Sequence, residues 1–185
     1  MKIEYLTMTR RTGLIDLLKE KGFEFGVEVG TDRGGYAADI CKRYPEFELI
    51  TMDPYLPYKE GDEVKTPEDM VKFREEAQKL LDNYPNCHFL PGQTSRQVAG
   101  ELEDESIDFV FIDGDHTYNG VMADLLLWYP KLKSGGILSG HDYVESEKNN
   151  YGVIEAVNEF VEDNKIDPLY VLRKGTYVDC WMFYK

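Results

Sequence analysis

The sequence predicts an α/β fold: a doubly wound, mostly parallel seven-stranded sheet with helices on both faces and a C-terminal antiparallel hairpin. Short apolar runs alternate five times with amphipathic helical patterns. This order of elements is typical of parallel strands joined by crossover helices. The chain then ends in two apolar runs around a glycine-containing turn at 174–178. Its 185 residues, 42% of them hydrophobic, fit one domain over residues 1–185.

In the first half of the chain, each predicted element is an apolar pattern that stops at glycine, proline or charge. In order they are a helix over 14–22, a strand over 23–29, a helix over 35–44, a strand over 47–53, a helix over 66–85 and a strand over 87–92. The helix over 66–85 has the clearest start, with Thr66 as N-cap, Pro67 at the first helical position and Asp69 completing a capping box. Its predicted buried face is Met70, Phe73, Ala77, Leu80 and Leu81. The charged, glycine- and proline-containing stretch 55–65 predicts a loop.

The second half continues the alternation and then breaks it. Its elements are a helix over 95–102, a strand over 107–113, a helix over 118–132, a strand over 135–143, a helix over 152–163 and strands over 169–173 and 179–185. Right-handed crossovers keep the strands before the hairpin parallel, so the hairpin is expected to insert one antiparallel strand.

Composition argues against several classes of partner. The 35 acidic and 21 basic residues give a formal net charge of -14 and no basic run, which repels nucleic acid and anionic membrane surfaces. The first residues lack the apolar core of a signal peptide, and no window reaches the roughly 20 apolar residues of a membrane span. The three cysteines lie far apart, which favours free thiols over disulfides. We therefore expect a cytoplasmic protein that binds neither nucleic acid nor membranes.

Glycines and carboxylates follow the first two predicted strands, where open α/β sheets bind their ligands. The stretch "GVEVGTDRGGY" has the spacing G-x-x-x-G-G rather than the G-x-G-x-x-G of dinucleotide folds. Glu28, two residues before Gly30, would repel a diphosphate but attract an ammonium or sulfonium group. Asp53, 25 residues further on, ends the next strand where a carboxylate can accept hydrogen bonds from ribose hydroxyls. The pattern favours a nucleoside with a cationic tail, such as S-adenosylmethionine; the alternative is that both carboxylates cap local amides.

A second acidic cluster follows two later strands. "FIDGDHTY" places Asp113 after one strand, and "GHDY" places His141 and Asp142 at the end of the next. If these strands are neighbours, their ends lie about 4.8 Å apart, and the three side chains can converge on one cation. The alternative is that the aspartates cap helices and turns.

Several stretches together resemble a known family: "VEVGTDRGG", "TMDPY", "LPGQTS", "SIDFVFIDGDHTYNGVMADLLLWYPKLKSGGILSGHDY" and "YGVIEAVNEF". They are similar to class I S-adenosylmethionine-dependent methyltransferases, which have a Rossmann-like fold. The resemblance is strongest to metal-assisted O-methyltransferases of the macrocin and mycinamicin type, and more distant to catechol and caffeoyl-coenzyme A enzymes. It covers nearly the whole chain from about residue 22.

The resemblance implies a set of cofactor-binding residues. Glu28 and Gly30 would lie against the methionine part of S-adenosylmethionine, and Asp53 would hold the ribose. Gln93 and Thr94 would flank the adenine. Asp113 would also border the cofactor.

The resemblance also implies a catalytic centre. Asp113 and Asp142 match ligands of a divalent cation, and His116 matches the general base, with Asp115 or Tyr118 near enough to orient its ring. At His141 related enzymes more often carry a carboxylate. This departure admits manganese or iron as well as magnesium, with His141 as a further ligand.

The resulting hypothesis is an O-methyltransferase that acts on a hydroxyl group of a small molecule or sugar. A non-catalytic, cofactor-binding regulatory module and a nucleotide-dependent oxidoreductase are the alternatives. The acceptor wall is expected from residues 51–66 and from Tyr118, Tyr143 and Tyr151. A homo-oligomer, in which a partner subunit completes the pocket, is left open by the sequence.

Overall fold

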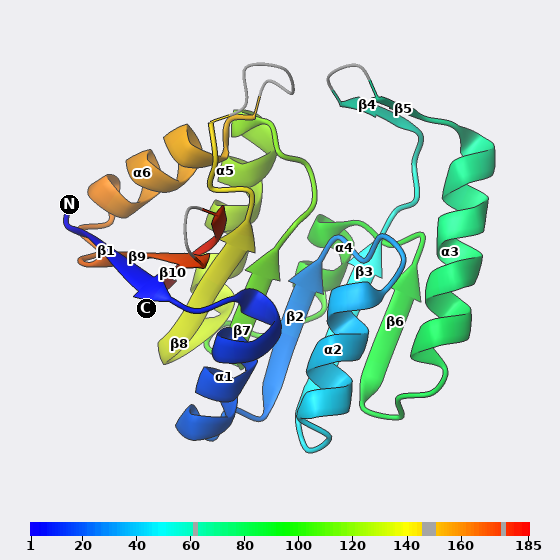
Figure 1. The fold of residues 1–185 in the computed structure, drawn as a ribbon, viewed down its shortest axis with the longest axis horizontal. Helices are drawn as coiled ribbons and strands as arrows, with labels where there is room; N and C mark the ends of the chain where they lie inside the picture. The colour runs from blue at the N-terminus through cyan, green and yellow to red at the C-terminus, as the bar shows by residue number, and fades with distance from the viewer. Residues whose placement is uncertain (61–62, 146–150, 175–176) are drawn as a thin grey trace.

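A computed structural model describes residues 1–60, 63–145, 151–174 and 177–185. Eight strands form one sheet in the order β1-β9-β10-β8-β7-β2-β3-β6 (Figure 1). They are β1 (Ile3–Thr7), β2 (Phe25–Val29), β3 (Glu48–Asp53), β6 (Cys87–Pro91), β7 (Ile107–Ile112), β8 (Leu132–His141), β9 (Leu169–Lys174) and β10 (Tyr177–Tyr184). Only β10 runs antiparallel to its neighbours, β8 and β9. The mostly parallel sheet and the inserted strand of the C-terminal hairpin are both confirmed.

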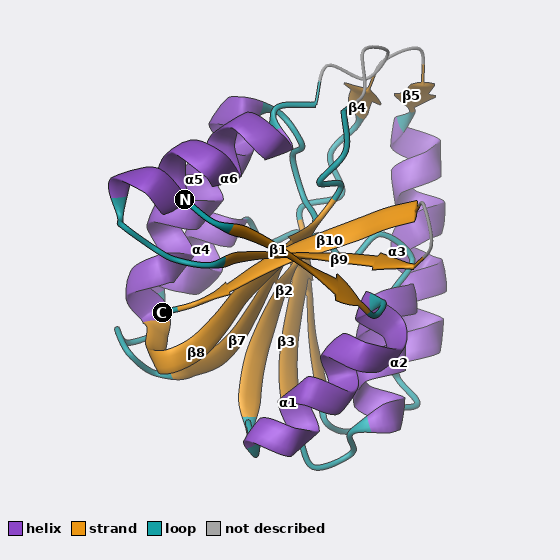
Figure 2. Cartoon of the chain, turned by 60° about the vertical axis from the view of Figure 1, so that its left-hand side comes forward, coloured by secondary structure: helices purple, strands orange, loops and turns teal. Residues whose placement is uncertain are grey.

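Helices cover the two faces of this sheet (Figure 2). One face packs against α1 (Ile15–Lys21), α2 (Gly35–Arg43) and α3 (Pro67–Leu81), and the other against α4 (Ser95–Gly100), α5 (Tyr118–Trp128) and α6 (Val153–Asp163). A π-helix over Arg10–Leu14 precedes α1, and a 3-10 turn over Tyr129–Lys131 follows α5. All of β7 is buried, which explains why its sequence is a nearly continuous apolar run. None of the helices in the described parts of the chain has the length and apolar character to cross a membrane.

The sheet has one strand more than the seven predicted. The additional strand, β1, lies at the edge and pairs in parallel with β9, with Ile3 opposite Leu169. Its side chains are only exposed or half-buried, so the apolar signal that marks a buried strand is weak there. A smaller difference concerns the predicted loop over 55–65, which contains a hairpin of β4 (Tyr58–Glu60) and β5 (Glu63–Lys65).

The capping box of α3 is confirmed, and one residue of its predicted buried face is wrong. The hydroxyl of Thr66 accepts a hydrogen bond from the Asp69 N–H, and the Asp69 carboxylate accepts one from the Thr66 N–H. Leu80 is 37% exposed, whereas the other four predicted side chains are buried, namely Met70, Phe73, Ala77 and Leu81.

The strand order reverses at the centre of the sheet. From β2 the chain moves outward to β3 and β6, and then returns to β7 on the opposite side of β2. Such a reversal leaves a crevice at the carboxyl ends of the two central strands, because the connections that follow them diverge to opposite sides. The fold thus places the residues after β2 and β7 at a ligand site.

Candidate active site

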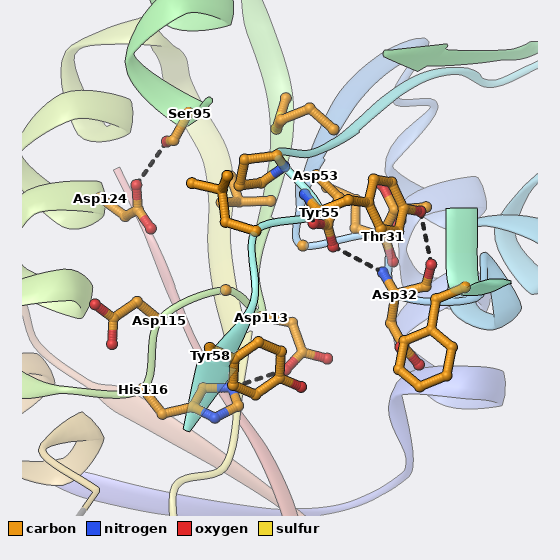
Figure 3. A pocket seen from close by; sticks show the side chains of 18 of the residues that line it. Thr31, Asp32, Asp53, Tyr55, Tyr58, Ser95, Asp113, Asp115, His116 and Asp124 are labelled. Carbon is orange, nitrogen blue, oxygen red and sulfur yellow. Dashed lines mark hydrogen bonds and ion pairs between the residues drawn. The ribbon is translucent and has the colours of Figure 1, made fainter. Parts of the chain in front are cut away.

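A cavity of about 840 Å³ opens at the carboxyl ends of β2, β3 and β7 (Figure 3). Its walls include residues 28–32, 52–59, 94–95 and 113–117, with Arg10, Arg11, Asp124 and Tyr151. It therefore brings together most of the predicted site residues. Among the lining residues that the sequence analysis did not assign are Arg10, Ser95 and Asp124.

Glu28 lies at the base of this cavity and is 2% exposed. Thr51, on the neighbouring strand, donates a hydrogen bond of 2.5 Å to Glu28 Oε2, and its hydroxyl contacts that of Thr31 at 2.7 Å. Burial raises the pKa of Glu28 well above its usual range, although the Thr51 hydrogen bond and the charge of Arg10 oppose the shift. A cationic group entering the cavity would stabilise the ionised carboxylate.

Asp53 connects two loops at the cavity rim. Its Oδ2 accepts a hydrogen bond of 3.0 Å from the Asp32 N–H, and its Oδ1 accepts one of 2.8 Å from the Tyr55 N–H. Asp32 and Tyr55 have φ of 46° and 50°, a left-handed conformation that costs free energy for residues other than glycine. Burial raises the pKa of Asp53, and the two backbone hydrogen bonds oppose this. Because a carboxylate has about four acceptor positions, Asp53 can still accept from a ligand.

Gly30 joins the loop after β2 to the loop after β7. Its φ is +93°, and a Cβ at this position would lie 2.0 Å from the backbone oxygen of Asp113. The Asp113 N–H in turn donates to the Val29 oxygen at 2.8 Å. Glycine is thus required here by the packing of one loop on the other, which also fixes the position of Asp113.

Of the two residues predicted to flank the adenine, one lines the cavity and the other does not. Thr94 lines the cavity, but its hydroxyl caps α4 by accepting from the Gln97 N–H and donating to Gln97 Oε1 at 2.8 Å. Gln93 is exposed and does not line the cavity.

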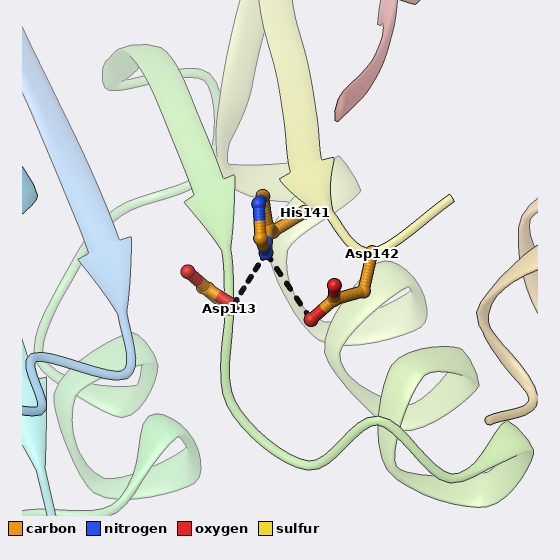
Figure 4. Close-up of side chains that lie close together, drawn as sticks. All are labelled: Asp113, His141 and Asp142. Carbon is orange, nitrogen blue, oxygen red and sulfur yellow. Dashed lines mark ion pairs between the residues drawn. The ribbon is translucent and has the colours of Figure 1, made fainter. Parts of the chain in front are cut away.

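The strands β7 and β8 are parallel neighbours, and the acidic cluster predicted at their ends is formed (Figure 4). Asp113, His141 and Asp142 each offer a ligand atom within 4.8 Å of those of the other two. His141 Nδ1 lies 3.1 Å from Asp142 Oδ2 and 3.7 Å from Asp113 Oδ1. Two carboxylates and an imidazole are a donor set that suits manganese or iron and also allows magnesium. The residues therefore fit the predicted cation.

His116 belongs to the same cluster. Its Nε2 lies 3.2 Å from Asp113 Oδ1 and 3.4 Å from Asp142 Oδ2, and its ring meets the ring of Tyr151 edge-on at 5.0 Å. These contacts orient the imidazole. The expected partners contact other groups: Asp115 accepts from the Thr117 N–H at 2.9 Å, and the Tyr118 hydroxyl donates to Glu159 at 2.8 Å.

Arg10 adds a positive charge that the sequence analysis did not assign to the site. Its Nη1 lies 3.8 Å from Asp113 Oδ2, and its guanidinium lies over the ring of Tyr36. Burial alone would raise the pKa of Asp142, but the hydrogen bond and charge of His141, followed by His116 and Arg10, hold it below its usual value. In the sequence, only the pairing of two arginines at 10–11 in an acidic chain pointed to a possible role for Arg10 in the site.

The predicted acceptor wall is formed in part. Tyr151 and residues 53–59 line the cavity. Tyr118 and Tyr143 do not: Tyr118 pairs with Glu159, and Tyr143 is buried with its hydroxyl donating to Asn158 Oδ1 at 2.7 Å.

The fold and the arrangement of the site define the class of protein, a class I S-adenosylmethionine-dependent methyltransferase. Residues 27–143 match the family described as a methyltransferase domain, and the chain belongs to this family.

The chain is also similar to individual proteins. The uncharacterized protein R132 of Acanthamoeba polyphaga mimivirus is 29% identical over an alignment of 148 positions, which covers 74% of this chain and 59% of that protein's length. An O-methyltransferase from Bacillus cereus in complex with SAH superimposes with a TM-score of 0.67 at 16% identity, covering 97% of this chain and 82% of the other. The O-methyltransferase NovP gives a TM-score of 0.65 at 18% identity, covering 95% and 77%. At these identities the solved structures establish the fold alone.

Proposed function

We propose that this protein transfers a methyl group from S-adenosylmethionine to a hydroxyl group of a small molecule or sugar, with the help of a divalent cation. One observation carries the proposal: Asp113 and His116 line the same cavity as Glu28 and Asp53, and Asp113 forms a cluster with His141 and Asp142 just beyond the cavity wall. A cofactor side and a metal side thus meet at one crevice.

On the cofactor side, Glu28 and Asp53 bind and orient S-adenosylmethionine. S-adenosylmethionine supplies a methyl group on a positively charged sulfonium. Glu28, buried with Thr51 as its donor, provides a negative charge for the cationic end of this ligand. Asp53 accepts hydrogen bonds from the ribose hydroxyls while its backbone contacts keep the rim loops in place. Such fixed positions lower the entropic cost of aligning the methyl group with the acceptor.

On the metal side, Asp113, His141 and Asp142 hold the cation. A bound divalent cation supplies Lewis acidity, which lowers the pKa of a hydroxyl group beside it. His116 then takes the hydroxyl proton on Nε2. Asp113 and Asp142 hold that nitrogen at the cluster and stabilise the imidazolium that forms.

The experiment is a transfer assay with methyl-labelled S-adenosylmethionine and a metabolite extract, run with added Mn²⁺ or Mg²⁺ and again after exhaustive chelation. We expect label on an acceptor oxygen, loss of transfer on chelation, and recovery when the ion returns. Transfer that survives chelation unchanged contradicts the metal role. Tight binding of S-adenosylhomocysteine without transfer to any component favours the regulatory module instead.

A further inference from the structure

One end of the cavity carries a carboxylate that the chemistry above does not use. Asp124, in the second turn of α5, is 9% exposed and lines the cavity. Figure 3 shows it beside Ser95 and well apart from the pair formed by Asp113 and His116. Its position is therefore remote from the proposed methyl transfer.

A chain of hydrogen bonds fixes the direction of the contact between Ser95 and Asp124. The indole nitrogen of Trp128 donates to Ser95 Oγ at 2.7 Å, and Ser95 Oγ donates to Asp124 Oδ1 at 2.6 Å. An indole N–H can only donate, so the serine hydroxyl accepts from Trp128 and gives its own hydrogen to Asp124. Oδ1 is an obligate acceptor.

The other oxygen, Oδ2, has no donor among the residues that the structure describes. It lies on the side of Gly114, a cavity-lining residue whose Cβ, if present, would be 3.9 Å from it. Because Asp124 lines the cavity, Oδ2 is open to it, and a donor on a bound ligand can take the place of water there. The neighbouring Thr94 does not compete for such a ligand, because its hydroxyl is occupied in capping α4.

We propose that Asp124 Oδ2 accepts a hydrogen bond from the exocyclic amino group of the adenine ring and so selects a 6-aminopurine over a 6-oxopurine. The inference rests on the proposed function, since it concerns the same cofactor. Asp53 at the ribose position and Asp124 at the purine edge then define the two ends of the nucleoside.

The test compares the dissociation constants of S-adenosylhomocysteine and S-inosylhomocysteine by calorimetry. The two ligands differ only at purine positions 1 and 6, where an oxo group would face the carboxylate. Wild-type protein should bind the adenosyl ligand about 10- to 100-fold more tightly, the range for a hydrogen bond to a charged group.

Asp124→Asn sharpens the test because the Ser95 hydroxyl keeps the amide oxygen at the Oδ1 position. The amide NH₂ then occupies the Oδ2 position and presents a donor, so the ratio of the two affinities should fall to about one or reverse. Asp115→Asn is the matched control, since Asp115 also lines the cavity but accepts from the Thr117 N–H. That variant should keep the wild-type ratio.

Equal affinities of wild-type protein for the two ligands overturn the inference and leave the proposed function standing. A clear wild-type preference that Asp124→Asn retains also overturns it, because another group then reads the purine. If wild-type protein binds neither ligand, the proposed function fails and the inference fails with it. The first comparison uses only wild-type protein, so a folding defect in a variant does not affect it.

Discussion

The two sides of the cavity use the same type of residue in opposite electrostatic settings. On the metal side, Asp142 is partly buried, but His141, His116 and Arg10 hold its pKa below the usual value. On the cofactor side, burial raises the pKa values of Glu28 and Asp53, and it raises the pKa of Asp124 to about 6. Their hydrogen-bond donors are neutral hydroxyl and N–H groups.

This difference explains how one crevice can bind a metal on one side and the cofactor on the other. A carboxylate whose pKa is held down by neighbouring imidazole and guanidinium groups stays ionised at neutral pH and can ligate a metal. Desolvated carboxylates with neutral donors have a higher free energy when ionised, so they gain more from a ligand that brings a positive charge or hydrogen-bond donors. Substitutions on each side should therefore affect different measurable quantities.

The largest effect is expected for Asp142→Asn. Asp142 has a φ of 54°, and asparagine tolerates this left-handed conformation, so the substitution mainly removes a charge. A neutral amide oxygen binds a divalent cation more weakly than a carboxylate does, so turnover should fall by up to about 10⁴-fold. Affinity for S-adenosylhomocysteine should change less than about threefold, because the cofactor carboxylates are intact. Parallel rate and calorimetry measurements check both values; a large loss of cofactor affinity would remove the distinction between the two sides.

His116→Ala should lower turnover about 10³-fold, the middle of the range for general base catalysis. Cofactor affinity should be nearly unchanged, since the His116 ring contacts the metal side. His88→Ala is the control: His88 is exposed, pairs with Glu48 at 2.7 Å and lies outside the cavity. If His116→Ala keeps wild-type turnover while chemistry is rate-limiting, another residue is the base.

Asp53→Asn should affect the cofactor side of the cavity, and so cofactor affinity more than turnover. Its amide cannot accept all of the backbone and ribose hydrogen bonds that the carboxylate accepts. We expect about 10- to 100-fold weaker binding of S-adenosylhomocysteine and less than about a tenfold change in turnover at saturating cofactor. Calorimetry and saturation kinetics separate the two. Unchanged affinity would show that Asp53 only holds the rim loops.

The last prediction concerns stability and not activity. The pKa of Asp124 is raised from 3.8 to about 6 in the fold, so the folded state binds this proton more tightly than the unfolded state does. The stabilisation is complete below about pH 4 and is lost as pH rises through about 6. Asp124→Asn does not titrate, so its free energy of unfolding relative to wild type should rise between pH 4 and pH 7 by at most about 3 kcal/mol. Urea denaturation of both proteins at the two pH values measures this; a constant difference would mean that Asp124 is ionised without cost.

The sequence alone determined the elements whose signals are local. The capping box at Thr66 and Asp69 fixed the start of α3, because cap and partner are three residues apart. The buried strand β7 was evident from its own apolar run. The order of strands and helices then predicted a parallel sheet with ligands at the strand ends, and hence the positions of Glu28, Asp53 and Asp113.

Only the tertiary structure decided which distant side chains meet. The edge strand β1 depends on a partner near residue 169, and Arg10, in the turn after that strand, lies 3.8 Å from Asp113, more than 100 residues further along the chain. Asp124 on α5 contacts Ser95 on α4 because both helices pack on the same face of the sheet. These contacts follow from strand pairing and helix packing between segments far apart in the chain, which local periodicity does not encode.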